Sequence, residues 1–337
     1  MKRIVLYEDH KSLNDATSYY INIINRAATN YGFVFLITDS INRIKFGDII
    51  FTITINNFIK SLLLKPYCKK IFWSQGIEPE ESFMRENSYF KYYAKNILEF
   101  ITLRHPGLKF FVSSKMLEHY KKKYKFRGNS YIIMPCYNLN YIKSDHNNLE
   151  RYNTPSFVYA GSLAKWQNID ETLLVYRDIE KKLNNSRLTL LTSEIEKAKR
   201  LIRKFNIKNA YIKYVDLKFL NIELSKHKYG FLLRKNNLVN NVATPTKMNS
   251  YLACGLIPIY TDAIDDYSKN INLNNFDLKI LSKSSVKEIS QRIIEFEDTY
   301  KDFKKFNAEI ENVFNYYYND EKYIEMIQTK LKNYYIA

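Results

Sequence analysis

The stretch "YGFLLRKNNLVNNVATPTKMNSYLACGLIPIYT" (residues 229–261) has a short apolar run at each end and helix signals between them. The runs 229–234 and 257–261 have the length and the aromatic and β-branched content of strands. Between them a polar loop leads to Thr244–Pro245, residue types favoured at a helix cap and at the first helical position. The stretch therefore predicts a strand, a helix over 246–254 and a second strand, and such a unit belongs to a parallel sheet.

The same alternation of strand and helix patterns continues in both directions along the chain. The expected strands lie at 2–7, 33–38, 48–55, 70–74, 108–113 and 131–134, and again at 157–161, 187–191, 210–215, 229–234 and 257–261. The expected helices lie at 17–30, 57–64, near 86–104, 169–184, 194–205, 217–227 and 246–254. Two successive sets of alternating strands and helices predict two doubly wound α/β domains, each with a parallel sheet.

The break between the two sets is an Asn-rich segment, 137–156, which has lost the hydrophobic periodicity and is interpreted as the linker. The expected domains are 1–145 and 155–300, followed by C-terminal helices over 301–337 that can pack back on the first domain. We expect the two Rossmann-like domains to face each other across a cleft. Ligands of open parallel sheets bind at the carboxyl ends of the strands, so the loops at those ends are the places to look for a site.

Composition favours a cytoplasmic protein. The chain has 337 residues, and none of its apolar runs reaches the roughly 20 residues of a transmembrane helix. Three cysteines are widely spaced, which predicts neither a disulfide framework nor a metal site. The net charge of +17 is spread over both halves and thickens locally at 60–70 and 115–127. An anionic membrane surface, nucleic acid and an ordinary lysine-rich solvated face are three explanations that remain open.

Two loops of the second domain carry residues suited to an anion. In "YAGSLAKWQN" (159–168) a strand ends at Gly161, and Ser162 and Lys165 follow before the next helix. In the opening stretch Arg234 ends a strand. A glycine permits close backbone approach, a hydroxyl donates a hydrogen bond, and basic side chains neutralise phosphate.

The predicted helix over 246–254 adds a second anion-binding feature to these loops. The amides of Thr246, Lys247 and Met248 would be free at its first turn. Viewed singly, each feature also fits an ordinary strand-to-helix loop or a solvated charge. Together, at one end of one sheet, they predict a diphosphate site.

These same two stretches carry a resemblance to a known family. "GSLAKWQN" and, about seventy residues later, "GFLLRKNNLVNNVATPTKMNSYLACGLIPI" resemble the donor-binding half of GT-B fold glycosyltransferases, especially family 4 members that assemble capsules and other surface polysaccharides. Segments 71–86 and 108–138 resemble the acceptor half of the same relatives more faintly. The resemblance implies transfer of a sugar from a UDP- or GDP-linked donor to a saccharide or lipid-linked acceptor, with retention of configuration and without a metal or other cofactor.

The resemblance also implies roles for individual residues. Gly161, Ser162, Lys165 and Thr246 would meet the donor diphosphate, while Arg234 and Lys247 would neutralise it as it leaves. The family carries two glutamates in this region, and here those positions are Val242 and Ser250. Recognition of the donor ribose and sugar would then depend on Asn241, Thr244 and Ser250.

The acceptor side is predicted from "SQGIEPEESFMR" (74–85), which follows a strand of the first domain. It offers four residues for sugar hydroxyls, namely Gln75, Gly76, Glu78 and Arg85, and Glu81 as the catalytic base. The alternative is a charged surface loop in which Glu81 pairs with Arg85. The lone histidine His10, after the first strand, is a further candidate for acceptor binding.

Three function classes follow from these observations. The favoured one is a glycosyltransferase of bacterial surface polysaccharide assembly, cytoplasmic and able to lie on the inner face of the cell membrane through its basic first domain. The second is a catalytically silent GT-B protein that binds sugars, prompted by Val242 and Ser250. The third is a basic nucleic-acid-binding protein, prompted by the net charge of +17 and 29 tyrosines; the chain shows no nucleic-acid-binding signature, so nucleic acid is not an expected partner.

Overall fold

A computed structural model describes residues 2–9, 13, 15–142, 149–299 and 301–333 of the chain. These residues divide into two compact units. Unit 1 combines residues 1–138 with the short segment 242–244 and the C-terminal stretch from residue 319 onward. Unit 2 consists of residues 139–241 and 245–318.

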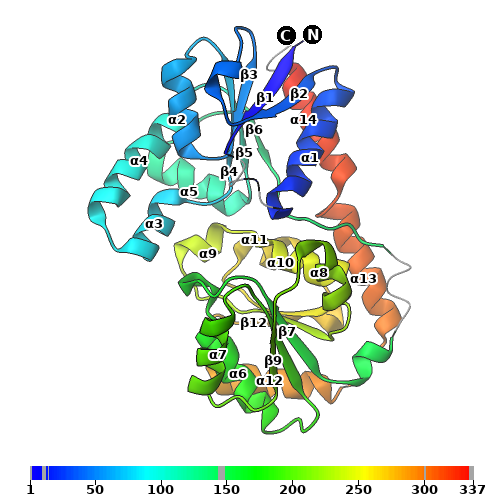
Figure 1. Cartoon of the computed structure of the whole chain (residues 1–337). Coiled ribbons are helices and arrows are strands. Elements are labelled where there is room, and N and C mark those ends of the chain that lie inside the picture. The colour runs from blue at the N-terminus through cyan, green and yellow to red at the C-terminus, as the bar shows by residue number, and fades with distance from the viewer. Residues whose placement is uncertain (1, 10–12, 14, 143–148, 300, 334–337) are drawn as a thin grey trace. The chain divides into compact units, whose positions relative to one another are not determined.

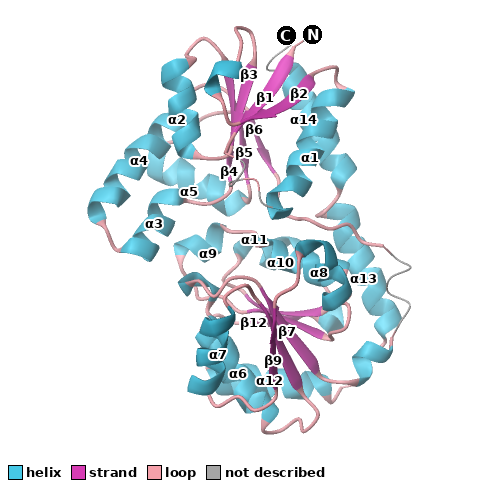
Figure 2. Ribbon diagram, viewed as in Figure 1, coloured by secondary structure: helices cyan, strands magenta, loops and turns pink. Residues whose placement is uncertain are grey.

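Unit 1 is built on a parallel six-stranded sheet with the strand order β2-β1-β3-β4-β5-β6 (Figure 2). The strands are β1 Arg3–Tyr7, β2 Val34–Thr38, β3 Ile49–Thr52, β4 Lys69–Ser74, β5 Leu108–Phe111 and β6 Tyr131–Ile133. The helices are α1 Asp15–Asn30, α2 Ile55–Leu64, α3 Glu78–Glu86, α4 Tyr89–Arg104, α5 Ser114–Tyr124 and α14 Asp320–Leu331. Helices α1 and α14 lie together on one side of the sheet, and α2 and α4 lie on the other (Figure 1).

The central strands of this sheet are apolar because both faces are covered by helices. Every residue of β3 and β5 is buried, as expected for strands inside a doubly wound sheet. The predicted helix near 86–104 is α4, and the shorter helix α3 before it was not predicted. Asn87 separates the two helices, because it adopts a left-handed backbone conformation (φ 52°) and ends α3. Ser88 then caps α4 by accepting a hydrogen bond from the amide of Lys91 at 3.4 Å.

Unit 2 holds a second parallel six-stranded sheet, with the order β12-β11-β10-β7-β8-β9. Its strands are β7 Ser156–Ala160, β8 Arg187–Leu191, β9 Ala210–Lys213, β10 Tyr229–Leu232, β11 Ile257–Thr261 and β12 Leu278–Ile280. Its helices are α6 Ile169–Glu180, α7 Ile195–Lys204, α8 Leu217–Leu224, α9 Leu238–Val242, α10 Thr246–Ala253, α11 Asp265–Asn270, α12 Val286–Glu297 and α13 Phe303–Tyr316. The prediction of two doubly wound α/β sheets is confirmed.

The stretch 229–261 forms the expected βαβ unit: β10 pairs in parallel with β11, and α10 connects them. A Cβ atom at Gly230 would lie 2.4 Å from the ring of Tyr251. The tyrosine of α10 therefore lies flat against β10 where the strand has no side chain. The Tyr251 hydroxyl donates to the carbonyl of Phe231 at 3.2 Å and accepts from the amide of Ala160 at 3.2 Å. One residue thus connects α10 to two neighbouring strands.

Two local predictions are wrong. The polar loop after β10 contains the short helix α9, whose first turn is stabilised by the Asn237 side chain, which accepts from the amide of Asn240 at 3.0 Å. Thr244 does not cap α10, because its hydroxyl accepts a hydrogen bond from the amide of Cys136 at 3.0 Å instead. Pro245 is therefore the cap residue and Thr246 the first helical residue.

The C-terminal segment is divided between the two units. Of the helices expected over 301–337, α13 belongs to unit 2 and α14 to unit 1. Helix α14 packs along α1, where Tyr19 donates to Asp320 at 3.0 Å and Arg26 pairs with Glu321 at 2.7 Å. Among the described residues, no helix combines the length and the apolar character needed to span a bilayer.

Candidate functional site

The cationic cluster of unit 2 lies at the carboxyl ends of β7 and β10. Arg234 follows β10 and is only 4% exposed. Its Nη1 donates to the carbonyl of Trp166 at 2.9 Å and to the side-chain oxygen of Asn240 at 3.4 Å. Its backbone amide donates to the Thr261 hydroxyl at 3.0 Å, which returns a bond to the Arg234 carbonyl at 2.8 Å. The arginine is therefore held firmly at the strand end.

Lys247, in the first turn of α10, lies over the loop that follows β7. Its Nζ donates to the side chain of Gln167 at 2.6 Å and lies 4.1 Å from the centre of the Tyr159 ring. A Cβ atom at Gly161, which has a φ of +131°, would lie 2.8 Å from Lys247 Cε. Glycine at this position therefore serves two purposes: it permits the backbone conformation and leaves space for the lysine.

The two cations act on each other electrostatically. Burial and the neighbouring Arg234 guanidinium hold the pKa of Lys247 well below its ordinary value. Burial also lowers the pKa of Arg234. Among the described residues neither side chain forms an ion pair with a carboxylate, and Arg234 Nε is buried without a hydrogen-bond partner. A buried and a partly buried cation side by side without a counter-ion are unfavourable, and an anionic ligand would relieve that cost.

The loop 161–163 is positioned by the neighbouring strand. Gly161 donates its amide to the Leu191 carbonyl at 2.8 Å, so the loop continues the β7–β8 pairing by one residue. The Leu163 amide donates to the Glu194 carboxylate at 2.5 Å. Lys197 Nζ donates to the Leu163 carbonyl at 2.7 Å. These bonds fix the path of the backbone that passes beneath Lys247.

Of the predicted donor residues, the structure brings Gly161, Lys247 and Arg234 together with the turn 165–167. Ser162 and Lys165 are exposed on that turn. Tyr159 and Gln167, which contact Lys247, were missed by the sequence reasoning. The only available signal was their position beside Gly161 and Lys165 in the same loop motif.

The residues predicted to bind ribose and sugar are engaged elsewhere. Asn241 donates to the Ala263 carbonyl at 2.8 Å and to the side chain of Asn236 at 2.9 Å. The Ser250 hydroxyl donates to the Thr246 carbonyl one helical turn earlier, at 3.1 Å. Val242 is buried, and its carbonyl accepts a hydrogen bond from Ser113 at 2.7 Å. In this structure the side chain of Asn241 serves to connect α9 to the loop after β11.

Unit 1 contains a separate cavity of about 330 Å³ at the carboxyl ends of β3 and β4. Four of the residues predicted for the acceptor side line it: Gln75, Gly76, Glu78 and Glu81. Arg85 is exposed, and its guanidinium lies 3.8 Å from the carboxylate of Glu86. The ion pair that Arg85 makes is therefore with Glu86, and not with Glu81 as the alternative prediction had it. His10 lies outside the described residues.

The geometry of this cavity gives Glu81 an unusual environment. A Cβ atom at Gly76 would lie 2.1 Å from Glu81 Oε1, so the carboxylate lies directly against the glycine backbone. Burial and the nearby Glu78 carboxylate raise the pKa of Glu81. The Gln75 Nε2 atom is buried without a hydrogen-bond partner. A raised carboxylate pKa beside an unpaired amide is typical of a site that exchanges a proton with a polar ligand.

Beneath this cavity lies a buried hydrogen-bond network. The Ser74 and Tyr120 hydroxyls are 2.7 Å apart, and Ser74 donates to the Gly76 carbonyl at 3.0 Å. Tyr120 and Tyr124 donate to the Glu99 carboxylate at 3.1 and 2.7 Å. Burial raises the pKa of Glu99 to about 7. The network holds the 74–76 loop in place from below.

No family model and no curated protein sequence matches the chain. Solved structures do resemble it. HepE from Anabaena, in complex with UDP-glucose, is 10% identical with a TM-score of 0.71, over 99% of this chain and 100% of that chain. Sucrose-phosphate synthase from Thermosynechococcus elongatus is 12% identical with a TM-score of 0.69, over 99% of both chains.

A third similar structure is TarM from S. aureus in complex with UDP. It is 13% identical with a TM-score of 0.64, over 86% of this chain. The match covers 56% of the TarM chain, so this protein spans little more than half of TarM's length. With two parallel six-stranded sheets and these neighbours, the chain has the GT-B fold of glycosyltransferases.

Proposed function

We propose that this protein is a glycosyltransferase that moves a sugar from a nucleotide-sugar to a saccharide acceptor. The observation that carries the proposal is the pair of cations beside the Gly161 loop, the buried Arg234 and the partly buried Lys247, which lack a carboxylate partner among the described residues. Two positive side chains at the carboxyl end of a parallel sheet suit a diphosphate. HepE and TarM were solved with UDP-glucose and UDP, which favours a uridine diphosphate donor over a GDP-linked one.

The chemistry follows from these charges. As the bond between sugar and diphosphate breaks, negative charge grows on the leaving phosphate, and fixed cations lower the barrier to its departure. We propose that Arg234 and Lys247 fill this role without a metal ion, in a retaining, family 4-like reaction. Glu81 would take the proton of the acceptor hydroxyl, since its raised pKa makes it a stronger base than an ordinary carboxylate.

The finer parts of the proposal concern the biological setting. The acceptor is proposed to be a saccharide of surface polysaccharide assembly, carried on a membrane lipid. The enzyme would then work in the cytoplasm at the inner face of the membrane.

A second candidate is a catalytically silent protein of the same fold that only binds sugars. It is favoured by Val242, which is buried, and Ser250, which is hydrogen-bonded within its own helix. These positions hold glutamates in the family that the chain resembles. The second candidate predicts donor binding without turnover.

The test is a thermal-shift screen with UDP-, GDP- and ADP-sugars, followed by detection of released nucleoside diphosphate. A ligand at a hundred times its dissociation constant stabilises the folded state by about 2.7 kcal/mol, which is readily measured. Binding together with release supports the enzyme, and binding without release in the presence of a panel of saccharides supports the silent protein. If neither nucleotide-sugars nor inorganic pyrophosphate bind, the diphosphate site is refuted.

A further inference from the structure

Helix α4 of unit 1 has an inverted polarity. Its outward side carries the α4 stripe, which consists of Phe90, Tyr93, Ile97, Phe100 and Ile101, exposed by 84, 62, 61, 41 and 38%. The spacing of three and four residues places these side chains along one face of the 16-residue helix. The inward side buries two polar residues, Glu99 and Thr102, together with Leu103. A surface helix of a soluble domain normally shows the opposite pattern.

The helix beside α4 extends this apolar surface. Helix α2 packs against α4, and its last turn exposes Leu63 and Leu64 by 74 and 53%. Just beyond it Tyr67 is 52% exposed and its ring lies 5.4 Å from that of Phe46, which is 84% exposed. Exposure of this many large apolar residues on two packed helices and the loop beside them marks an interaction surface.

The charge around this surface is positive near α2 and the last turn of α4, whereas at the start of α4 Lys91 and Lys95 pair with Glu86 and Glu78 of α3. Residues 55–77 contain four lysines and no acidic residue. Residues 87–117 contain one acidic residue, Glu99, which is buried. Lys60 and Arg104 are exposed, and the Arg104 guanidinium lies 5.6 Å from the centre of the Phe100 ring. An apolar stripe bordered by basic side chains complements an anionic, partly apolar surface.

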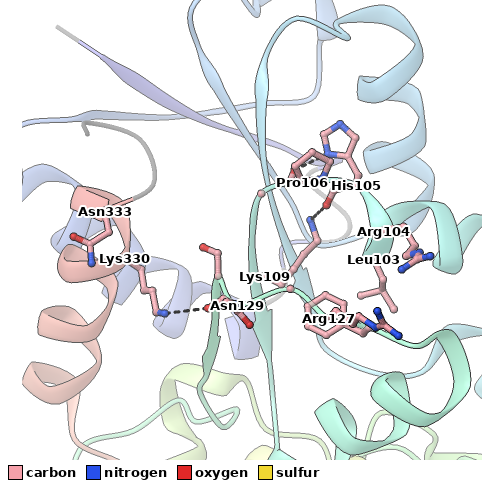
Figure 3. A pocket seen from close by; sticks show the side chains of 13 residues that line it. Leu103, Arg104, His105, Pro106, Lys109, Arg127, Asn129, Lys330 and Asn333 are labelled. Carbon is pink, nitrogen blue, oxygen red and sulfur yellow. Dashed lines mark hydrogen bonds between the residues drawn. The ribbon is translucent and has the colours of Figure 1, made fainter.

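The α4 stripe ends at a cationic cavity of about 520 Å³ (Figure 3). Its basic lining consists of Arg104, Lys109, Arg127 and Lys330, and no carboxylate is among the described residues that line it. Burial lowers the pKa of Lys109 to about 7, so the two arginines and Lys330 supply the fixed positive charge. Lys109 is 1% exposed and donates to the His105 carbonyl at 3.1 Å. The Ser130 hydroxyl is buried without a hydrogen-bond partner. The cavity therefore offers donors and positive charge to an anionic group next to the apolar stripe.

We propose that unit 1 docks on an anionic lipid bilayer through the α4 stripe and the last turn of α2. The aromatic and aliphatic side chains would enter the headgroup–acyl boundary, while Arg104 and the cavity would meet lipid phosphates. A second copy of this chain fits less well, since a symmetric contact would bring two positive borders together. The role of the docking rests on the proposed function: it would bring the acceptor cavity to a lipid-linked saccharide. The docking itself does not depend on that function.

The proposal narrows the membrane surface expected from the basic residues at 60–70 and 115–127 to the 60–70 side, which holds Lys60 and the last turn of α2. Lys70 is buried and donates to the carbonyls of Lys65 and Cys68. Lys123 pairs with Glu80 at 2.6 Å and with Glu99 at 3.4 Å. Lys70 and Lys123 are used inside unit 1, so the proposal depends on the apolar stripe together with Lys60 and Arg104.

The experiment is flotation of the full chain with vesicles of phosphatidylcholine alone and with about one third phosphatidylglycerol, at low salt. We expect the chain to bind the anionic vesicles at least tenfold more strongly than the neutral ones. The double variant Phe90→Ser with Ile97→Ser should bind the anionic vesicles at least tenfold more weakly than the unchanged chain. The double variant Lys60→Gln with Arg104→Gln should also bind them more weakly. The matched control is Phe219→Ser with Ile222→Ser on α8, whose side chains are 50 and 57% exposed. This control should bind vesicles as the unchanged chain does.

UDP binding, measured on the same proteins without vesicles, reports on the integrity of unit 2, and circular dichroism on folding. Equal binding of the unchanged chain to both vesicle types, or unaltered binding by the folded serine variant, overturns the docking proposal. So does a dimer, seen by light scattering, that the Phe90 and Ile97 substitutions convert to a monomer. Loss of vesicle binding with intact UDP binding supports docking by this face. A chain that docks but binds no nucleotide refutes the proposed function and leaves the docking standing.

Discussion

Replacing Lys247 with methionine should stabilise the free protein and weaken donor binding at once. The ammonium group is crowded by Arg234, and its pKa is well below the ordinary value because charge is unfavourable there. Methionine fills a similar volume without that charge, so the free energy of unfolding should rise by about 1–3 kcal/mol. Donor binding should weaken by about 1.5–3 kcal/mol, the range of a hydrogen bond to a charged group, which is roughly 10- to 150-fold.

The same lysine should make donor binding dependent on pH. A diphosphate favours the protonated form and therefore raises the lysine pKa on binding. Above the pKa that Lys247 has in the free protein, the lysine takes up a proton when the donor binds. Donor affinity therefore falls by up to tenfold per pH unit, until the pH reaches the pKa that Lys247 has in the complex. A nucleotide-sugar is the right ligand, because its diphosphate keeps a constant charge over this range, whereas UDP itself titrates near neutrality.

The assay is isothermal titration calorimetry in two buffers of different ionisation enthalpy, with urea unfolding in parallel. The observed enthalpy should depend on the buffer for the unchanged chain and not for Lys247→Met. Lys181→Met, at an exposed lysine of unit 2, is the matched control and should leave both affinity and stability nearly unchanged. If Lys247→Met binds the donor as tightly as the unchanged chain, or destabilises it by several kcal/mol, the cation-pair argument is refuted.

Three further predictions follow from the two units. Gly230→Ala would bring a methyl group to 2.4 Å from the Tyr251 ring and should lower the free energy of unfolding, measured in urea, by about 1–3 kcal/mol. An unchanged urea midpoint of unfolding would contradict the packing of α10 on β10. Glu99 binds a proton more tightly in the folded protein, where its pKa is about 7, than in the unfolded chain, where the ordinary value is 4.5. The free energy of unfolding should therefore fall by up to about 3 kcal/mol as the pH rises from 4.5 to 7, and Glu99→Gln should remove this pH dependence. Glu81→Gln should reduce the rate of transfer by about 10²-fold or more with donor affinity unchanged, and a full rate would remove the base role.

The parallel sheets were predictable because their strands are apolar on both faces and alternate with helices. The prediction for 229–261 placed both strands and the helix within two residues of their observed bounds. Helix α9 was missed because "LVNNV" is short and lies among asparagines, so neither apolar period nor composition indicates a helix. Thr244 was a reasonable cap by residue type, but the amide of Cys136, over a hundred residues away in the chain, takes its hydroxyl.

The site likewise contains residues that the sequence could predict and partners that it could not. Arg234 and Lys247 were predictable, because a strand end and a helix start place them at one edge of the sheet. The partners that orient them were not: the Trp166 carbonyl and the Gln167 side chain depend on the conformation of a three-residue turn. The acidic loop at 74–85 was identified as a candidate, but the closeness of Glu81 to Gly76 comes from the turn of α3.

The path of the chain between the units affects how the protein can fold during synthesis. Helix α14 completes unit 1 beside α1, yet it leaves the ribosome after the whole of unit 2. Emergence of the first 138 residues therefore does not finish unit 1, and the side of α1 that α14 covers stays open while nearly two hundred further residues are made. A nascent chain stalled before residue 319 should accordingly be digested by protease within α1, and chaperones that recognise apolar helix faces should bind it there.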